Sequence, residues 1–285
     1  MERVPAVRRR RLGEELRRLR DLAGLTSGEA ATLAGWHQSK VSRIETGRSS
    51  VRTEDVTVLL DVYGVHDLAL RDLLGTLAGG GYQRGWWHDF RDVLPVEYRD
   101  FISLETGADR ARSMENTVVP GLLQTPDYAR ALTADVMPQL SRRELDALVD
   151  VRLARQAVLR QDRPLELWAV LDEAVLRRGV GGREVMAAQL RKLEAAAELP
   201  QVRLQVLPFA AGGHMGVTNS FVIFSFPRIA DLDVVVVDHL TGSLYVDRKE
   251  DITAYSAAFT RLHSRALPRE ESAAMIAGIR NELSG

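Results

Sequence analysis

The sequence predicts an α+β protein, in which a five-helix, all-α N-terminal domain precedes a mixed α+β domain with a largely antiparallel sheet. Three observations lead to this prediction. Apolar residues recur at helical spacing as far as Leu77. Three glycines at 79–81 then interrupt the pattern. From Leu165 several strand-like runs follow one another with one helix between the first two, which is typical of α+β domains.

The first helix is predicted from about Leu12 to Ala23, where leucines at 12, 16, 19 and 22 share one face. Residues 1–11 before it include Arg3 and the arginine run 8–11. We expect a flexible arm here. Such an arm can reach phosphate or a narrow minor groove, and it can equally be a solvated tail.

A helix, a short turn and a second helix are predicted over residues 26–47. Thr26 can cap the first helix, and Glu29 stands three residues later to complete a capping box. Small residues at 30 and 31 allow close helix crossing, and Gly35 can end the helix. Val41 and Ile44 turn inward on the second helix, which starts near Gln38 and stops at Gly47.

The outer face of this second helix is polar, as a helix that enters a DNA groove requires. Glutamine and arginine carry paired hydrogen-bonding groups that match adenine and guanine edges. We expect four residues to read bases: Gln38, Ser39, Ser42 and Arg43. Four others are expected to contact phosphate: Thr26, Ser27, Lys40 and Arg48. The alternative interpretation is an ordinary helical hairpin with a solvated outer face.

This stretch resembles the helix-turn-helix of the phage-repressor and Cro type, also called the xenobiotic-response-element family, from Leu12 to about Leu74. The resemblance rests on Leu25-Thr26, on the spacing from Ala31 to Gly35, and on the run from Gln38 to Gly47. It implies sequence-specific binding to double-stranded DNA. It also implies a structural ion pair between Arg20 and Glu45, which would fasten the first helix to the end of the recognition helix.

Two further helices, from about Thr53 and from about Asp67 to Leu77, complete the N-terminal domain, or head. We therefore expect three parts: a DNA-binding domain over 1–78, a linker and anchoring segment over 79–96, and a regulatory and dimerisation domain over 97–285. Trp86 and Trp87 in the linker are expected to anchor it on the next domain, with base stacking as the alternative.

The second domain should begin with a helix from about Glu97 to Met114. A loop then enters a short helix, with Thr125 as cap before Pro126. One long helix is expected over 141–161 and another over 182–198. The predicted strands are 165–171, 202–207, 221–226, 234–237 and 244–246, and two helices, 251–265 and 269–283, close the chain.

Four segments of this domain resemble a family of actinobacterial regulators. They are the run from Val119 to Arg130, Arg152–Gln156, Leu171–Arg177 and Val206–Phe209. The family couples a repressor-type head to a C-terminal domain of poorly defined biochemistry. Its members resemble antitoxins and are often associated with a small partner protein. The resemblance implies a transcriptional regulator, with an antitoxin-like module that captures a small partner as the alternative.

Charge is unevenly distributed along the 285 residues. Residues 1–48 hold 11 Lys and Arg against 6 Asp and Glu, a net of +5, whereas the remainder holds 27 against 33, a net of −6. A basic head on an acidic body suits a protein that places one end on phosphate. The chain has no cysteine, which excludes disulfides and the commonest zinc ligands. No apolar run approaches the roughly 20 residues that span a bilayer, so we expect a cytoplasmic protein without a membrane partner.

A catalytic or metal site in the body is the minor hypothesis. His214 follows two glycines, His239 follows Asp238, and Asp172-Glu173 ends a strand. Their spacing matches no motif, and structural roles are the more plausible interpretation. We therefore expect no catalytic residue, no metal and no cofactor. The partners expected are double-stranded DNA, a second copy of the chain in a homodimer, and a small protein or small-molecule ligand at the C-terminal domain.

Overall fold

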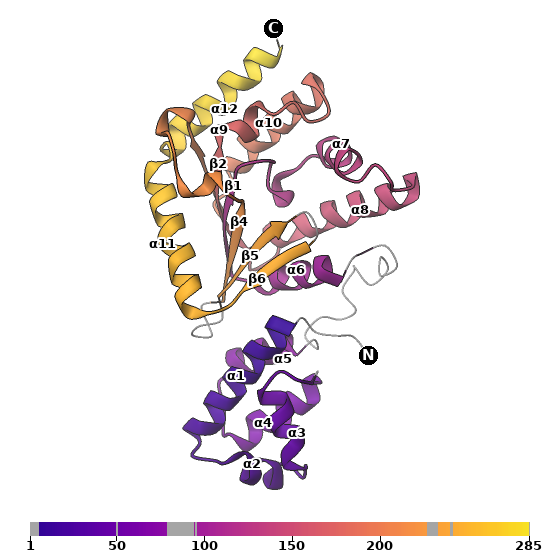
Figure 1. The fold of residues 1–285 in the computed structure, drawn as a ribbon, viewed down its shortest axis with the longest axis vertical. Coiled ribbons are helices and arrows are strands. Elements are labelled where there is room, and N and C mark those ends of the chain that lie inside the picture. Colours follow the sequence, from indigo (N-terminus) through magenta and orange to yellow (C-terminus); the bar gives the residue numbers. More distant parts are fainter. Residues whose placement is uncertain are drawn as a thin grey trace. The chain divides into compact units, whose positions relative to one another are not determined.

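The computed structural model describes residues 6–49, 51–78, 94, 96–226, 233–239 and 242–284 (Figure 1). These residues form two compact units, residues 6–78 and residues 94–284. The glycines at 79–81, the tryptophans at 86 and 87 and nearly all of the predicted linker lie outside the described residues, as does Arg3.

The N-terminal unit contains five helices among its described residues, as predicted. They are α1 (Ala6–Leu22), α2 (Ser27–Leu33), α3 (Gln38–Glu45), α4 (Thr53–Val62) and α5 (Leu68–Leu77). The unit encloses a small aliphatic core. Its fully buried side chains come from all five helices and include Leu12, Leu16, Ala30, Val41, Val56, Leu59, Leu60 and Leu74.

The flexible arm expected over residues 1–11 is wrong from residue 6 onward. Helix α1 begins at Ala6, so the arginine run 8–11 is helical. Within this run, Arg9 Nε donates a hydrogen bond to the carbonyl oxygen of Gly47 at 3.3 Å. Arginine is a good helix former, and a tertiary partner after α3 extends the helix beyond the leucine pattern that predicted it.

The C-terminal unit is built on a mixed six-stranded sheet in the order β3-β2-β1-β4-β5-β6 (Figure 1). The strands are β1 (Arg110–Glu115), β2 (Glu166–Asp172), β3 (Val202–Leu207), β4 (Phe221–Ser225), β5 (Val234–His239) and β6 (Gly242–Val246). Three of the five pairings are antiparallel, and β1 pairs with β2 and β2 with β3 in parallel. The predicted α+β class, with a largely antiparallel sheet, is confirmed.

Helices cover both faces of this sheet. They are α6 (Val96–Gly107), α7 (Pro126–Val136), α8 (Arg142–Arg155), α9 (Glu173–Arg177), α10 (Arg183–Ala197), α11 (Lys249–Arg265) and α12 (Arg269–Ser284), with 3-10 turns η2 (Gly121–Leu123) and η3 (Gln156–Leu159). Helix α11 lies on one face, where Phe259 and Leu262 join the buried cluster of Ile223 and Val235 (Figure 1). Helix α6 lies on the other face, where the Phe101 ring meets the Phe224 ring edge-on at 5.3 Å.

The helix predicted from Glu97 to Met114 is wrong in its second half. Helix α6 ends at Gly107, and residues 110–115 form β1, which pairs with a strand on each side. The run Arg-Ala-Arg-Ser-Met-Glu contains no β-branched or aromatic residue, so local propensity gives no strand signal. Pairing on both edges outweighs that propensity.

The long helix predicted over 141–161 is shorter than expected. Helix α8 begins after the Ser141 cap, which forms a capping box with Glu144, and it ends at Arg155. The 3-10 turn η3 then continues to Leu159. None of the described helices is long and apolar enough to cross a membrane.

Candidate nucleic-acid interface

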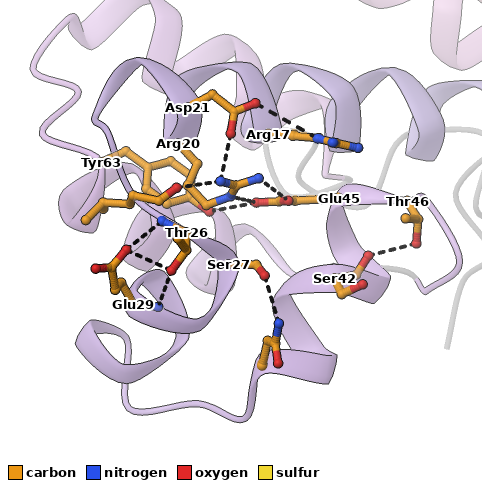
Figure 2. A network of polar contacts seen from close by, with 12 residues as sticks. Arg17, Arg20, Asp21, Thr26, Ser27, Glu29, Ser42, Glu45, Thr46 and Tyr63 are labelled. Carbon is orange, nitrogen blue, oxygen red and sulfur yellow. Dashed lines mark hydrogen bonds and ion pairs between the residues drawn. The ribbon is translucent and has the colours of Figure 1, made fainter.

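Two helices and a tight turn present the candidate surface. Thr26 and Glu29 form a reciprocal capping box at the start of α2: the Glu29 amide donates to Thr26 Oγ1 at 3.2 Å, and the Thr26 amide donates to Glu29 Oε2 at 2.8 Å (Figure 2). Gly35 takes a φ of 70°, a left-handed conformation that favours glycine. The chain therefore reverses between α2 and α3 within four residues, 34–37.

Helix α3 has one buried and one exposed face. Val41 and Ile44 are buried in the core of the unit. The residues expected to read bases are all exposed: Gln38, Ser39, Ser42 and Arg43. His37, which was not expected to have a role, caps the helix by accepting from the Ser39 amide at 3.3 Å. The arrangement leaves a polar helix face open to a ligand as wide as a DNA groove.

The first residues of α2 and α3 contact each other. Gln38 Nε2 donates to Ser27 Oγ at 3.0 Å. As acceptor in this bond, the Ser27 hydroxyl keeps its own proton for a further acceptor. The bond also holds the side-chain amide of Gln38 at the start of α3, where Gln38 is exposed.

Arg20 and Glu45 meet in the interior of the unit. Arg20 Nε and Nη2 donate to the two carboxylate oxygens of Glu45 at 2.7 Å and 3.1 Å, and both side chains are less than a tenth exposed (Figure 2). The Tyr63 hydroxyl donates to Glu45 Oε1 at 3.3 Å. Burial raises the pKa of that hydroxyl, so it remains a donor. These bonds tie the end of α1 and the end of α4 to the end of α3.

Gly13 allows α1 to touch the end of α3. A Cβ at this position would lie 2.5 Å from the carbonyl oxygens of both Ile44 and Glu45, closer than real Cβ contacts. This close approach was not expected from the sequence. The available signal was a glycine at the second position of the helix predicted from about Leu12, because glycine costs helix stability unless packing requires it.

The residues expected to contact phosphate differ in the bonds that they already make within the protein. Thr26 Oγ1 donates to Glu29 Oε2, and Arg48 is exposed. Lys40 Nζ lies 2.7 Å from Asp55 Oδ1 and 3.6 Å from the centroid of the Trp36 ring. Lys40 must therefore exchange Asp55 for a phosphate if it is to contact DNA. Sequence reasoning missed this pairing because Asp55 lies on the next helix.

Of the residues considered for chemistry in the second unit, Asp172 and His214 come together. His214 Nε2 lies 3.1 Å from Asp172 Oδ2. Asp172 also caps α9 by accepting from the Ala174 amide, and its neighbour Glu173 accepts from the Phe209 amide. Within the described residues, no three His, Cys, Asp or Glu side chains are arranged to hold a metal ion. These contacts fasten the loop after β3 to the end of β2.

Two protein-family models match the chain. Residues 11–74 match a helix-turn-helix domain family, which indicates a DNA-binding regulator. Residues 98–278, well over half of the chain, match a family described as a domain of unknown function (DUF5753). The chain belongs to the DUF5753 family. In this DUF5753 protein the helix-turn-helix match spans α2 and α3 together with the Arg20–Glu45 pair. No curated protein and no solved structure matches the chain.

Proposed function

We propose that the chain is a sequence-specific DNA-binding transcriptional regulator of the phage-repressor type, which inserts α3 into the major groove of double-stranded DNA. The observation that carries this proposal is the exposed polar face of α3. Its opposite face is buried, and its C-terminal end is fixed by Arg20 through Glu45. A rigid helix with an open polar face is the geometry that groove recognition requires.

Roles on this surface follow from the side-chain chemistry. Arg43 and Gln38 are the strongest candidates for guanine and adenine edges, and Ser39 and Ser42 supply single hydrogen bonds to bases beside them. Thr26, Ser27, Lys40 and Arg48 serve the phosphates. The position of exposed Thr26 and half-buried Ser27 at the start of α2 supports their assignment, because helix N-termini attract phosphate.

Selection of a binding site from random duplexes, followed by titration of variants, tests the proposal. Arg43→Ala is expected to weaken the selected site by roughly 1–3 kcal/mol and to relax the preference at one base pair. Arg142→Ala removes an exposed arginine in the second unit and serves as the matched control. Wild-type affinity for Arg43→Ala across a range of salt would remove Arg43 from the base-reading set. Failure to select any sequence would overturn the proposal itself.

We further propose that the chain binds DNA as a homodimer assembled through its C-terminal domain. A single small module buries only about 600–1,000 Å² on DNA, which is little for finding one site in a genome. Two heads can engage half-sites about one helical turn apart and gain affinity through effective concentration. Helical residues within 97–160 are the proposed dimer surface. Sedimentation of the full chain as a monomer at the concentrations where it binds DNA would contradict this.

The C-terminal DUF5753 domain is proposed to control DNA binding through a small protein partner or a small-molecule ligand. The resemblance to actinobacterial regulators that associate with a small partner supports this role. Capture of binding proteins on the immobilised full chain, followed by their addition to a preformed DNA complex, tests it. We expect a genuine partner to change the DNA affinity of the full chain.

A further inference from the structure

A cavity of about 80 Å³ lies on the face of the sheet that α6 covers. Its walls come from β1, β4 and β5, from α6, and from the segment that leads into η2. The apolar part of the lining includes Phe101, Leu122, Phe224 and Val236. The cavity is partly open to solvent and belongs entirely to the second unit.

Polar side chains interrupt this otherwise apolar face. Ser113 and Glu115 point to the same side of β1 as Ala111, and the neighbouring residues of β2 on this face are Leu167, Ala169 and Leu171. Ser113 is 3% exposed, and its hydroxyl donates to Glu115 Oε1 at 2.8 Å. A serine and a carboxyl in the centre of a sheet break the apolar pattern, and such breaks are expected at functional sites.

The negative charge in the cavity has no balancing cation among the described residues that line it. Arg155 is the one lining cation, and its Nε and Nη2 donate to both oxygens of Glu105 at 2.8 Å and 2.7 Å. That pair is therefore neutral as a unit. Glu115 and Asp238 are the two other carboxylates of the lining, and Asp238 is exposed and accepts from Ser243 Oγ at 2.6 Å.

The electrostatics of Glu115 follow from this arrangement. Burial, together with a smaller contribution from the charge of Asp238, raises the pKa of its carboxyl to about 7. Hydrogen bonds with Ser113 and Ser220 lower the pKa of Glu115 and offset only part of that rise. A carboxyl kept in such surroundings destabilises the fold at neutral pH unless a positive group joins it.

The size of the cavity decides which ligands it can hold. Drug-sized ligands and nucleotides need roughly 300–1,000 Å³. A benzene molecule occupies an engineered cavity of about 150 Å³. About 80 Å³ therefore accepts a few non-hydrogen atoms, such as the end of a longer molecule. The apolar rings of Phe101 and Phe224 beside the two carboxylates favour a positive group that carries a short carbon chain.

We propose that this cavity binds a primary alkylammonium group, which ion-pairs with Glu115 and Asp238 and places its short alkyl chain against Phe101 and Phe224. An ammonium carries three N–H donors and no acceptor, which matches two carboxylates and the oxygen of the Ser113 hydroxyl, whose own proton is donated to Glu115. The proposal names a chemical class of ligand for the C-terminal domain, and its biological meaning rests on the proposed control of DNA binding by that domain. Binding itself is measured without DNA, so its failure leaves the DNA-binding proposal intact.

The group can belong to a small amine or to a lysine side chain of a partner protein. Ethylammonium chloride is the first probe, because two carbons and one nitrogen fit the cavity. N-acetyl-lysine N-methylamide is the second probe and presents the same group as a protein would. Each is titrated into the isotopically labelled full chain at constant ionic strength while amide chemical shifts are recorded. We expect saturable shifts centred on residues 113–115 and 236–238.

Glu115→Gln keeps the shape of the side chain and removes its charge. We expect it to weaken ethylammonium binding at least about tenfold, because a charge-assisted hydrogen bond is lost. Asp238→Asn should weaken binding less, since Asp238 is exposed. Asp150→Asn removes an exposed carboxylate on α8 and should change nothing. Ethanol, the neutral probe of the same length, should not bind.

Binding of both probes would assign the site to a protein lysine as well as to free amines, and binding of ethylammonium alone would assign it to small amines. Equal affinity of wild type and Glu115→Gln would overturn the proposal, as would equal shifts with ethanol or the absence of saturable shifts with both probes. The Glu115→Gln spectrum also reports whether the variant is folded, so a misfolded variant cannot pass for a loss of binding. If Glu115→Gln is misfolded, Asp238→Asn is the variant to compare. An ethylammonium affinity of Asp238→Asn equal to that of the wild type would also reject the proposal.

Discussion

Arg20 holds both carboxylate oxygens of Glu45, with Nε at 2.7 Å and Nη2 at 3.1 Å. Glu45 is the last residue of α3, and Arg20 lies in the last turn of α1. A planar guanidinium paired in this way fixes direction as well as distance. The pair is buried and therefore sets how α3 projects from the core, and the hydrogen bond with Glu45 raises the pKa of Arg20.

The first prediction concerns this pair. Glu45→Ala leaves the buried Arg20 guanidinium without its carboxylate, and we expect a loss of about 3–5 kcal/mol in the unfolding free energy of the N-terminal unit. Hydrogen exchange of the slowest amides in α1 and α3 of the full chain measures this. The double variant Arg20→Met with Glu45→Leu removes both charges and should recover most of the loss. An unchanged exchange rate in Glu45→Ala would mean that the pair is solvated.

The second prediction concerns the contact of α1 with the end of α3. Gly13→Ala places a methyl group where the backbone carbonyls of Ile44 and Glu45 lie, so one helix must move. Overpacking of this kind costs typically about 1–3 kcal/mol. Gly28→Ala is the matched control, because the nearest atom to its Cβ is Thr26 Oγ1 at 3.9 Å. There, removing a helical glycine should stabilise by roughly 0.5–1 kcal/mol. Equal stability of the two variants, measured by the same hydrogen exchange, would contradict the contact.

The sequence predicted the helices of the N-terminal unit well, because their signals are local. A capping box at Thr26, a terminating glycine at 35 and inward apolar residues on α3 all lie within a few residues of the elements that they define. Contacts between elements left weaker signals. Gly13 against α3 and Asp55 beside Lys40 join residues of different helices, and neither periodicity nor capping reports such pairs.

Strand β1 shows why part of the second unit could not be predicted from the sequence. Its residues alternate between the two faces of the sheet, but Arg110 and Arg112 lie on one face and Ser113 and Glu115 break the apolar pattern of the other. Hydrophobic alternation is the main sequence signal for a strand, and here it is absent. Ser113 and Glu115, which interrupt the apolar pattern of the strand, also line the cavity. The position where the sequence pattern fails is therefore the position of the proposed ligand site.

The third prediction concerns Lys40, whose Nζ is held by Asp55 at 2.7 Å. Asp55→Asn removes the competing carboxylate, and we expect stronger binding to DNA of any sequence with a salt dependence steeper by up to about one phosphate contact. Lys40→Ala should weaken binding to all sequences alike and make the slope shallower. Titrations of selected and random duplexes at several salt concentrations measure both effects. A wild-type slope for Lys40→Ala would show that Lys40 stays with Asp55 in the complex, and identical slopes for the two variants would show that even a released Lys40 contacts no phosphate.

The fourth prediction concerns the pH dependence of stability in the second unit. The folded state raises the pKa of Glu115 from 4.5 to about 7, so it binds this proton more tightly than the unfolded state. The resulting stabilisation is fully present below pH 4.5 and is lost as the pH rises to about 7. Relative to Glu115→Gln, the wild type should lose on the order of 3 kcal/mol over this window.

The unfolding free energies of the wild type and Glu115→Gln are compared at a series of pH values. Hydrogen exchange of the amides in β1 and β2 of the full chain measures them. Of the charged groups that line the cavity, Asp238 raises the pKa of Glu115, while Glu105 and Arg155 pair with each other, and Asp238→Asn should therefore shift the window to lower pH. The pKa of the Tyr128 hydroxyl is raised by burial and also by Glu115, so this hydroxyl stays protonated throughout the window. Asp150→Asn should leave it in place, because that carboxylate is exposed on α8. A wild type and a Glu115→Gln variant with parallel stability curves would show that water reaches Glu115. A flat curve in the presence of ethylammonium would instead show that the bound cation replaces the proton.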